Sequence, residues 1–374
     1  MNFEFNQDQQ LLQETVVRFL EREYDYRQAI AGEGDSGGVW DKLAELGMLG
    51  ALLGENEGGL GGPVEAMIVM EASGEALLLE PLIGQVIVAG TILAAAGESG
   101  GRQVEAIVTG ASRVVLATIE AGMMSPFDHD LIETRLTREG NGFRLHGLKA
   151  PIPDGATANR FLVTARNESG ALCIISVPVG QPGVTIRRMR AIDGRGIAEL
   201  ELDAVLPADA LIDVVNVEET LDTALDAGLA AACAELVGAM SAMLDQTREY
   251  TGQREQYGAK LATYQALQHR MADMFIAAEL ARSMAFLAAA SIERPAAERR
   301  GAVSAAWHEV LRGARFVGEN GVQLHGGMGM SEETDVAYYF TRLIAGASIW
   351  GSANRHLRRF DKAPRMDRTI AGVD

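Results

Sequence analysis

The first third of the chain carries apolar residues at helical spacing. Residues 6–30 begin at a cap-like Asn6, with Gln9 three positions later as in a capping box. One face of this predicted helix collects its apolar side chains, Leu12, Val16, Phe19 and Leu20. Two alanine-rich apolar helices are predicted at about residues 63–79 and 83–96. No segment before about residue 110 alternates like a strand, so an all-α N-terminal domain is predicted for residues 1–112.

Strand patterns replace helical ones from Arg113. The run RVVLAT is apolar, and the run IETRLTR alternates Ile, Thr and Leu with charged or polar residues. The pair Asn141-Gly142 separates this run from FRLHG, which is typical of a tight hairpin. Three more strands are predicted at residues 161–165, 171–177 and 197–202. Short strands at this spacing predict a β-barrel or sandwich as the middle domain, residues 113–214.

Helical spacing returns at about residue 215. Two predicted helices carry leucine- and methionine-rich stripes, and an alanine-rich helix follows at residues 297–320. The stripe positions are Leu236, Met240, Met243 and Leu244 in the first helix, and Leu267, Met271, Met274, Phe275 and Ala278 in the second. Such stripes are core by default, and long helices with short connections pack as an antiparallel bundle. The prediction is therefore an α+β multidomain chain that ends in a four-helix bundle, residues 215–374.

Composition narrows the class of partner. The 374 residues carry a formal net charge of −18, which argues against nucleic acid or an anionic membrane as the main partner. Two distant cysteines, Cys173 and Cys233, fit a reducing cytoplasm, and the first residues lack the features of a signal peptide. The uncharged run between Glu80 and Glu98 is short and contains Pro81, so it predicts a buried helix rather than a membrane span. The histidines show no metal-binding spacing, so no metal site is predicted.

Four segments carry motif-like residues in a fixed order. A helix that begins at Trp40 is followed by the glycine-rich loop GENEGGLGG, and the run REQYG stands at residues 254–258. Gln265 follows shortly after, and Gln323 begins the run QLHGGMGM. In this order the segments resemble those of acyl-CoA dehydrogenases, which carry Arg-x-x-Phe-Gly and Gln-x-x-Gly-Gly-x-Gly at similar offsets. The resemblance extends over nearly the whole chain.

The residues of these motifs suit flavin adenine dinucleotide (FAD). Arg254 offers a fixed fork of N–H donors to a pyrophosphate, Tyr257 can lie flat against an aromatic ring, and Gly258 lets backbone approach closely. The resemblance implies that FAD is the cofactor and acyl-CoA the substrate. It also implies an oligomer in which one set of residues serves the flavin of a neighbouring subunit: Arg254, Tyr257, Gly258, Gln265, Gln323, Gly326 and Gly327.

The catalytic glutamate of the family has no counterpart at either of its usual positions. Counted from Arg342, the stretch RLIAGASIWGSANRHL places Gly351 where the glutamate of the terminal turn is expected, and the alternative helical position falls on Gly228. Glycine has no side chain to accept a proton, so the catalytic residue stays unassigned. The nearest carboxylates in sequence are Asp226, which fits the N-terminal face of a helix, and Glu333, which fits a loop anchor.

The flavin-facing strands of the middle domain also depart from the family. Residues 117–122 read ATIEAG where the family often has Thr-Glu-Pro-x-Ala-Gly, and residues 149–155 read KAPIPDG where it has Lys-x-x-Trp-Ile-Thr-Asn-Gly. Pro151 and Pro153 stand where an aromatic ring and a hydroxyl would border the flavin, and Pro153 has neither a hydroxyl nor an N–H donor. The segments expected to border the chain's own flavin, residues 117–122 and 149–155, differ from the family motifs. The segments expected to contact the flavin of a neighbouring subunit, residues 254–258 and 323–329, match them.

This asymmetry resembles the glutamate-lacking subunits of bacterial α2β2 heterotetrameric acyl-CoA dehydrogenases of steroid and other ring or side-chain catabolism. The leading interpretation is a cytoplasmic, base-lacking subunit of an FAD-dependent enzyme that desaturates an acyl-CoA thioester together with a second acyl-CoA dehydrogenase subunit. An electron-transfer flavoprotein is the expected kind of electron acceptor. Three alternatives stay open: a homotetrameric acyl-CoA dehydrogenase with a displaced base, a non-redox acyl-CoA-binding scaffold subunit, and a flavin-dependent monooxygenase on the same fold.

Overall fold

The N-terminal part of the chain is helical, and it is more broken than the apolar pattern predicts. The computed structural model describes residues 5–32, 36–331 and 333–362. The capping box of Asn6 and Gln9 begins α1 (Gln7–Glu23). Asp25 then accepts two backbone N–H bonds and begins a separate helix, α2 (Tyr26–Ala31), so the single helix predicted over residues 6–30 is wrong. The other elements of this part are α3 (Ser36–Glu45), α4 (Met48–Ala51), the 3-10 turn η1 (Glu55–Glu57), α5 (Pro63–Glu75), the π-helical η2 (Ile83–Val88), α6 (Ala89–Ala94) and α7 (Glu98–Val108).

The middle part forms one mixed sheet. Its strands are β1 (Val114–Ala117), β2 (Arg135–Glu139), β3 (Gly142–Pro153), β4 (Arg160–Arg166), β5 (Leu172–Pro178), β6 (Val184–Arg190), β7 (Gly196–Pro207) and β8 (Leu211–Ile212). Short 3-10 turns lie between them at η3 (His129–Leu131), η4 (Gly155–Thr157) and η5 (Ala208–Ala210). The order is β6-β7-β3-β2-β4-β5-β8, and β1 pairs in parallel with β4. In the hairpin between β2 and β3, Glu139 pairs with Gly142, so the loop is Gly140-Asn141, one residue before the predicted pair.

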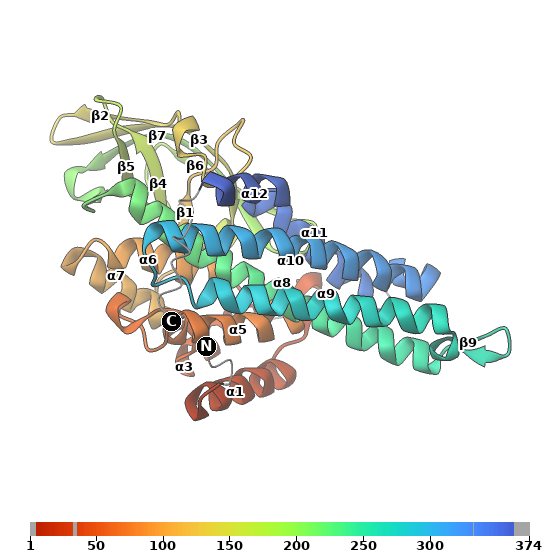
Figure 1. Ribbon diagram of the computed structural model, residues 1–374. Helices are drawn as coiled ribbons and strands as arrows, with labels where there is room; N and C mark the ends of the chain where they lie inside the picture. The colour runs from red at the N-terminus through yellow and green to blue at the C-terminus, as the bar shows by residue number, and fades with distance from the viewer. Residues whose placement is uncertain (1–4, 33–35, 332, 363–374) are drawn as a thin grey trace, which may run out of the picture.

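Long helices form the C-terminal part and extend to the right in Figure 1. They are α8 (Val217–Gln253), α9 (Gln265–Ala289), α10 (Ala296–His325), α11 (Val336–Trp350) and α12 (Ala353–Lys362). Small elements join them: β9 (Glu255–Gln256), β10 (Ala259–Lys260), η6 (Leu261–Thr263) and η7 (Gly326–Met330). The order of helices, sheet and helices confirms the predicted fold class. The limits predicted for the domains, after residues 112 and 214, fall in the two connections between these parts. The division into three domains stays a prediction.

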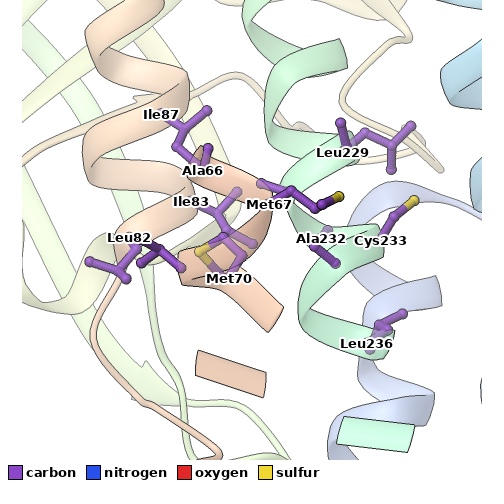
Figure 2. Close-up of a cluster of buried hydrophobic side chains, with 14 of the residues drawn as sticks. Ala66, Met67, Met70, Leu82, Ile83, Ile87, Leu229, Ala232, Cys233 and Leu236 are labelled. Carbon is purple, nitrogen blue, oxygen red and sulfur yellow. The ribbon is translucent and has the colours of Figure 1, made fainter. Parts of the chain in front are cut away.

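Helix α8 is the centre of the core. It is 37 residues long, and among the described residues it alone is long and apolar enough to cross a membrane, but 78% of its most apolar window is buried inside the protein. Side chains from α5, η2 and α8 meet in one apolar cluster, shown in Figure 2: Ala66, Met67, Met70, Leu82, Ile83, Ile87, Leu229, Ala232, Cys233 and Leu236. Gly74 and Gly238 let α5 and α8 touch backbone to backbone, because a Cβ on either glycine would lie 1.9 Å from a carbonyl oxygen of the other helix.

Candidate active site

The candidate flavin residues on α8 and α9 lie where these two helices join. Arg254 caps the end of α8, and residues 255–260 form a hairpin that projects from the bundle (Figure 1). Arg254 is exposed, and its guanidinium makes no hydrogen bond or ion pair with the residues that the structure describes. Tyr257 is 96% exposed in the turn of the hairpin, and Gly258 follows it with φ +80°. Gln265 is the exposed first residue of α9.

The candidate residues on α10 lie at the same end. Tyr250 of α8 stacks on His325 with ring centroids 4.4 Å apart, which places the end of α10 beside the end of α8. Gln323, Gly326 and Gly327 are exposed there, and Gly326 ends α10 with φ +61°. The structure thus brings all seven predicted residues to one end of the bundle, called the distal end below.

Both positions predicted for the missing glutamate lie at the opposite, proximal end, where the bundle meets the sheet. The turn after α11 is fixed there by three donors: Ser125 Oγ and His356 Nε2 donate to the carbonyl oxygen of Trp350 at 3.1 and 2.9 Å, and Trp307 Nε1 donates to that of Gly351 at 2.9 Å. Burial lowers the pKa of His356 to about 4, so its ring is neutral and carries its proton on Nε2. Gly351 adopts φ +98°, which side chains rarely tolerate.

A buried arginine holds the helix that leads into this turn. Arg342 of α11 lies 2.8 Å from Glu235 Oε1 and 3.1 Å from Asp193 Oδ2, and it donates to the carbonyl oxygens of Leu77 and Leu78. These contacts join α11 to α8, to the loop between β6 and β7, and to the segment after α5. The position of Trp350 and Gly351 is therefore set by all three parts of the chain.

A side chain is blocked at one of the two glycine positions and strained at the other. A Cβ on Gly228 would lie 2.6 Å from a methyl group of Val88 and 2.7 Å from the indole of Trp350. A Cβ on Gly351 would lie 3.3 Å from the side chain of Ser125. The indole of Trp350, the residue before Gly351, therefore fills the space that a side chain at Gly228 would need. Neither glycine position supplies a general base.

The space beside these glycines is a small inner chamber of about 50 Å³. Its walls include Ile83, Val88, Pro151, Pro153, Asp154 and Trp350. A single water needs about 10–15 Å³ of such space, so the chamber holds only a few waters and is too small for a flavin ring. A wider pocket of about 410 Å³ shares Ile119, Pro151 and Ile349 with the chamber and also borders Ser125 and Ser352.

Lys149 and Glu120, which belong to the altered motifs of the middle part, form a buried ion pair within the sheet. Lys149 Nζ contacts the carboxylate of Glu120 and donates to Thr164 Oγ1 at 3.0 Å, and Thr134 Oγ1 donates to Glu120 at 2.7 Å. Burial lowers the pKa of Lys149 to about 8. Burial alone would raise the pKa of Glu120, but the charge of Lys149 and the hydrogen bonds hold it below its usual value. These two charges stabilise each other rather than face a ligand.

Neither carboxylate proposed from sequence as an alternative base is suitably placed. Asp226 lies fully buried in the third turn of α8, between Arg299 at 3.2 Å and Arg359 at 2.7 Å, so its assignment to an N-terminal helix face is wrong. Glu333 is exposed in the turn before α11, and no side-chain contact within the described residues anchors it. Burial raises the pKa of Asp226, although the two arginines favour its charged form. Its carboxylate is enclosed between these arginines and does not line the space beside the glycines, so it has no access to a substrate there.

The sequence did not point to Asp154. This residue adopts φ +62°, lines the inner chamber and accepts a hydrogen bond from Gly84 N at 2.9 Å. Burial raises the pKa of its carboxyl group to about 6. In the sequence, its only signal is an Asp-Gly pair where the family has Asn-Gly, and nothing in the chain pattern shows that it borders a cavity.

The two ends lie too far apart to serve one flavin in one chain. Gly228 and Arg254 are both placed by α8, 26 positions apart (254 − 228), which corresponds to about 39 Å at ~1.5 Å per residue. A dinucleotide does not span this distance. Flavin contacts at the distal end therefore need a ring site on another chain.

Comparison with known proteins gives the family. The description "Acyl-CoA dehydrogenase, N-terminal domain" matches residues 6–102, and "Acyl-CoA dehydrogenase, C-terminal domain" matches residues 219–362. Acyl-CoA dehydrogenase FadE12 of Mycobacterium tuberculosis is 30% identical over 327 residues, which are 81% of this chain and 81% of FadE12. The chain belongs to the acyl-CoA dehydrogenase family. FAD is accordingly its cofactor, and the exposed, unpaired donors of the distal end fit the pyrophosphate and adenosine arm of that group.

Two solved structures of the family superpose over nearly the whole chain. A variant of the Tcur3481–Tcur3483 steroid ACAD has a TM-score of 0.82 at 27% identity, and the match covers 95% of this chain and 97% of that chain. The ChsE4–ChsE5 complex from Mycobacterium tuberculosis has a TM-score of 0.84 at 25% identity and covers 98% and 100%. Each of these two structures is named for a pair of proteins.

Proposed function

We propose that this chain is the base-lacking subunit of a heteromeric, FAD-dependent acyl-CoA dehydrogenase. The observation that carries the proposal is the contrast along α8. Exposed flavin-binding residues stand at the distal end, and the proximal end is filled by Trp350 with glycine at both positions of the family's base. The two similar structures, Tcur3481–Tcur3483 and the ChsE4–ChsE5 complex, are each named for two proteins, which supports a second subunit.

The division of labour follows from the chemistry. Desaturation of an acyl-CoA needs a base for the α-proton and hydrogen-bond donors for the thioester oxygen, and bound FAD accepts the hydride from the β-carbon. In this proposal Arg254 binds the pyrophosphate of a flavin whose ring lies in the partner, and Tyr257 and Gly258 support the adenosine arm. The partner supplies the glutamate. We further propose a cytoplasmic α2β2 tetramer, a lipid or steroid acyl-CoA as substrate, and an electron-transfer flavoprotein as acceptor.

Co-expression with a second acyl-CoA dehydrogenase chain encoded nearby tests the proposal. We expect the two chains to co-purify with one FAD per pair of chains, and acyl-CoA to bleach the flavin of the complex. A stable homotetramer with one FAD per chain and full activity would favour the homotetrameric alternative.

An acyl-CoA-binding scaffold without redox chemistry is the second candidate, because the inner chamber of about 50 Å³ leaves no room for a flavin ring. A complex that binds acyl-CoA yet contains no flavin would favour it. A flavin-dependent monooxygenase needs no base for an α-proton, and oxygen consumption with product hydroxylation would favour that function. Each alternative thus gives a different flavin count or product.

A further inference from the structure

A second and much larger cavity lies between the N-terminal helices and the sheet. This interdomain cleft has a volume of about 930 Å³ and is bordered by α2, α3, the segment before η2, and β6. Ligand pockets commonly fall between ~300 and ~1,000 Å³. None of the flavin candidates of the distal end lines it.

Two arginines of an edge strand line one wall of the cleft. Arg188 and Arg190 stand two positions apart on β6, so their side chains leave the same face of the strand at a spacing of about 7 Å. Arg188 Nε donates to Ala156 O at 2.7 Å, and one terminal nitrogen of Arg190 donates to Ile30 O at 2.6 Å. Neither guanidinium forms an ion pair with the described residues, so two oriented positive charges keep most of their N–H donors unused.

A second wall of the interdomain cleft is acidic and lies deeper than the two arginines. The side chain of Glu80 is 6% exposed, with its carboxylate 3.6 Å from Arg113, whose guanidinium stacks on Trp40 at 4.4 Å. Asp154 contributes a second carboxyl group to the cleft and also borders the inner chamber. Burial raises the pKa of Glu80 to about 7 and that of Asp154 to about 6. The carboxyl oxygens of both groups accept hydrogen bonds in either protonation state, so they can bind N–H donors of a ligand.

The other charged groups of the cleft are already matched. Lys42 pairs with Glu23 at 2.5 Å, and the carboxylate of Asp25 accepts the first N–H groups of α2. What remains is a cationic rim suited to phosphate oxygens and an acceptor-rich inner wall. Guanidinium groups held in place bind phosphate through paired N–H donors.

We propose that the interdomain cleft binds a nucleotide-sized organic phosphate, with its phosphate on Arg188 and Arg190 and its donor-bearing base toward Glu80 and Asp154. The site is separate from the flavin arm at Arg254 and does not depend on the proposed function. Because Asp154 lines both cavities, a ligand here would touch the wall of the inner chamber.

Calorimetric titration with GDP tests the proposal, because guanine carries N–H donors and differs from the adenine of FAD and acyl-CoA. The protein is saturated with FAD beforehand. We expect GDP to bind with a Kd below about 1 mM, and guanosine to bind at least about tenfold more weakly. The double substitution Arg188→Gln with Arg190→Gln should weaken GDP binding at least about tenfold and leave guanosine binding unchanged.

Arg187→Gln is the matched control, because Arg187 leaves the other face of the same strand and pairs with Glu199 at 3.3 Å. It should not change GDP binding, and Glu80→Gln should weaken GDP and guanosine alike. All variants are first compared by thermal unfolding. No binding of GDP, equal binding by the double variant, or equal weakening by Arg187→Gln would each overturn the proposal.

Discussion

The two ends of α8 use the same residue types in opposite ways. At the proximal end Gly228 is packed against Val88 and Trp350, and the nearby arginines Arg299 and Arg359 are both bound to Asp226. At the distal end the neighbourhood of Gly252 is open, and Arg254 has no partner among the described residues. The proximal end therefore satisfies its charges and fills its space within one chain, whereas the distal end leaves Arg254 unpaired and the space beside Gly252 open.

This contrast teaches where a partner is needed. A buried charge without a partner costs several kcal/mol, so a chain that folds keeps its internal ion pairs complete. An exposed arginine costs little when water solvates it, and it gains energy when a phosphate replaces that water. The distal end is built for contact with something outside the chain, and the proximal end is built for the chain itself.

The largest effect expected from this contrast is on turnover. The chain alone, mixed with FAD, should bleach flavin with any acyl-CoA at least about 10²-fold more slowly than the complex, because it lacks the general base, which contributes about 10²–10⁴-fold. Anaerobic bleaching of the flavin absorbance measures this directly. Rapid bleaching by the single chain would show that a base exists within it. Asp154 would then be the first residue to substitute, because it is the carboxyl group that borders the inner chamber.

The second largest effect is expected on stability, when the buried ion pair of Lys149 and Glu120 is lost. Lys149→Ala leaves Glu120 buried without its charge partner and should lower the free energy of unfolding by about 3–5 kcal/mol. Lys42→Ala removes an exposed pair with Glu23 and should leave the free energy of unfolding nearly unchanged. Urea denaturation followed by circular dichroism compares the two. Similar losses in both variants would contradict the buried character of the Lys149 pair.

The turn after α11 should respond to acid. The pKa of His356 is lowered to about 4 in the folded chain from 6.5, so the unfolded chain binds the extra proton first as the pH falls. His356 therefore contributes stability above about pH 6.5, and this contribution, on the order of 3 kcal/mol, is lost as the pH falls toward 4. The slope of stability against pH between 6.5 and 4 should be shallower in His356→Gln than in the unaltered protein. Parallel slopes would show that other groups cause the acid response.

Flavin retention is the corresponding test at the distal end. Arg254→Ala should weaken FAD binding in the complex by about 1.5–3 kcal/mol, because one charge-assisted contact is lost. Flavin content after gel filtration and a titration of FAD into the stripped complex measure the effect. Arg248→Ala is the control, since Arg248 is exposed on the same helix and already pairs with Asp245. Equal flavin content in the two variants would make Arg254 an ordinary surface residue.

The sequence predicted the features that depend on short stretches of chain. The capping box at Asn6, six of the eight strands of the middle part and the run at residues 254–258 were readable, because spacing and residue type specify them. The strands β6 and β8 were missed. The break at Asp25 was missed, since a side chain that binds the backbone outweighed a continuous apolar face. The contact of Trp350 with Gly228 could not be predicted, because 122 positions separate them (350 − 228) and packing between α8 and α11 decides it.

The smallest expected effect compares one substitution at both ends of the same helix. Gly228→Ala should destabilise the protein by about 1–3 kcal/mol, because its Cβ would lie 2.6 Å from Val88 and 2.7 Å from Trp350. Gly252→Ala should instead stabilise it by up to about 1 kcal/mol, because a Cβ there meets nothing within 4 Å and alanine loses less backbone entropy in a helix. Urea midpoints of the two variants measure both signs at once, and Trp350 fluorescence shows whether the indole has moved. If Gly228→Ala leaves the stability unchanged and the indole does not move, the space beside Gly228 accepts a side chain. The steric argument against a side chain at this position would then be wrong. If Gly252→Ala destabilises the protein, the distal end of α8 is less open than its surroundings indicate.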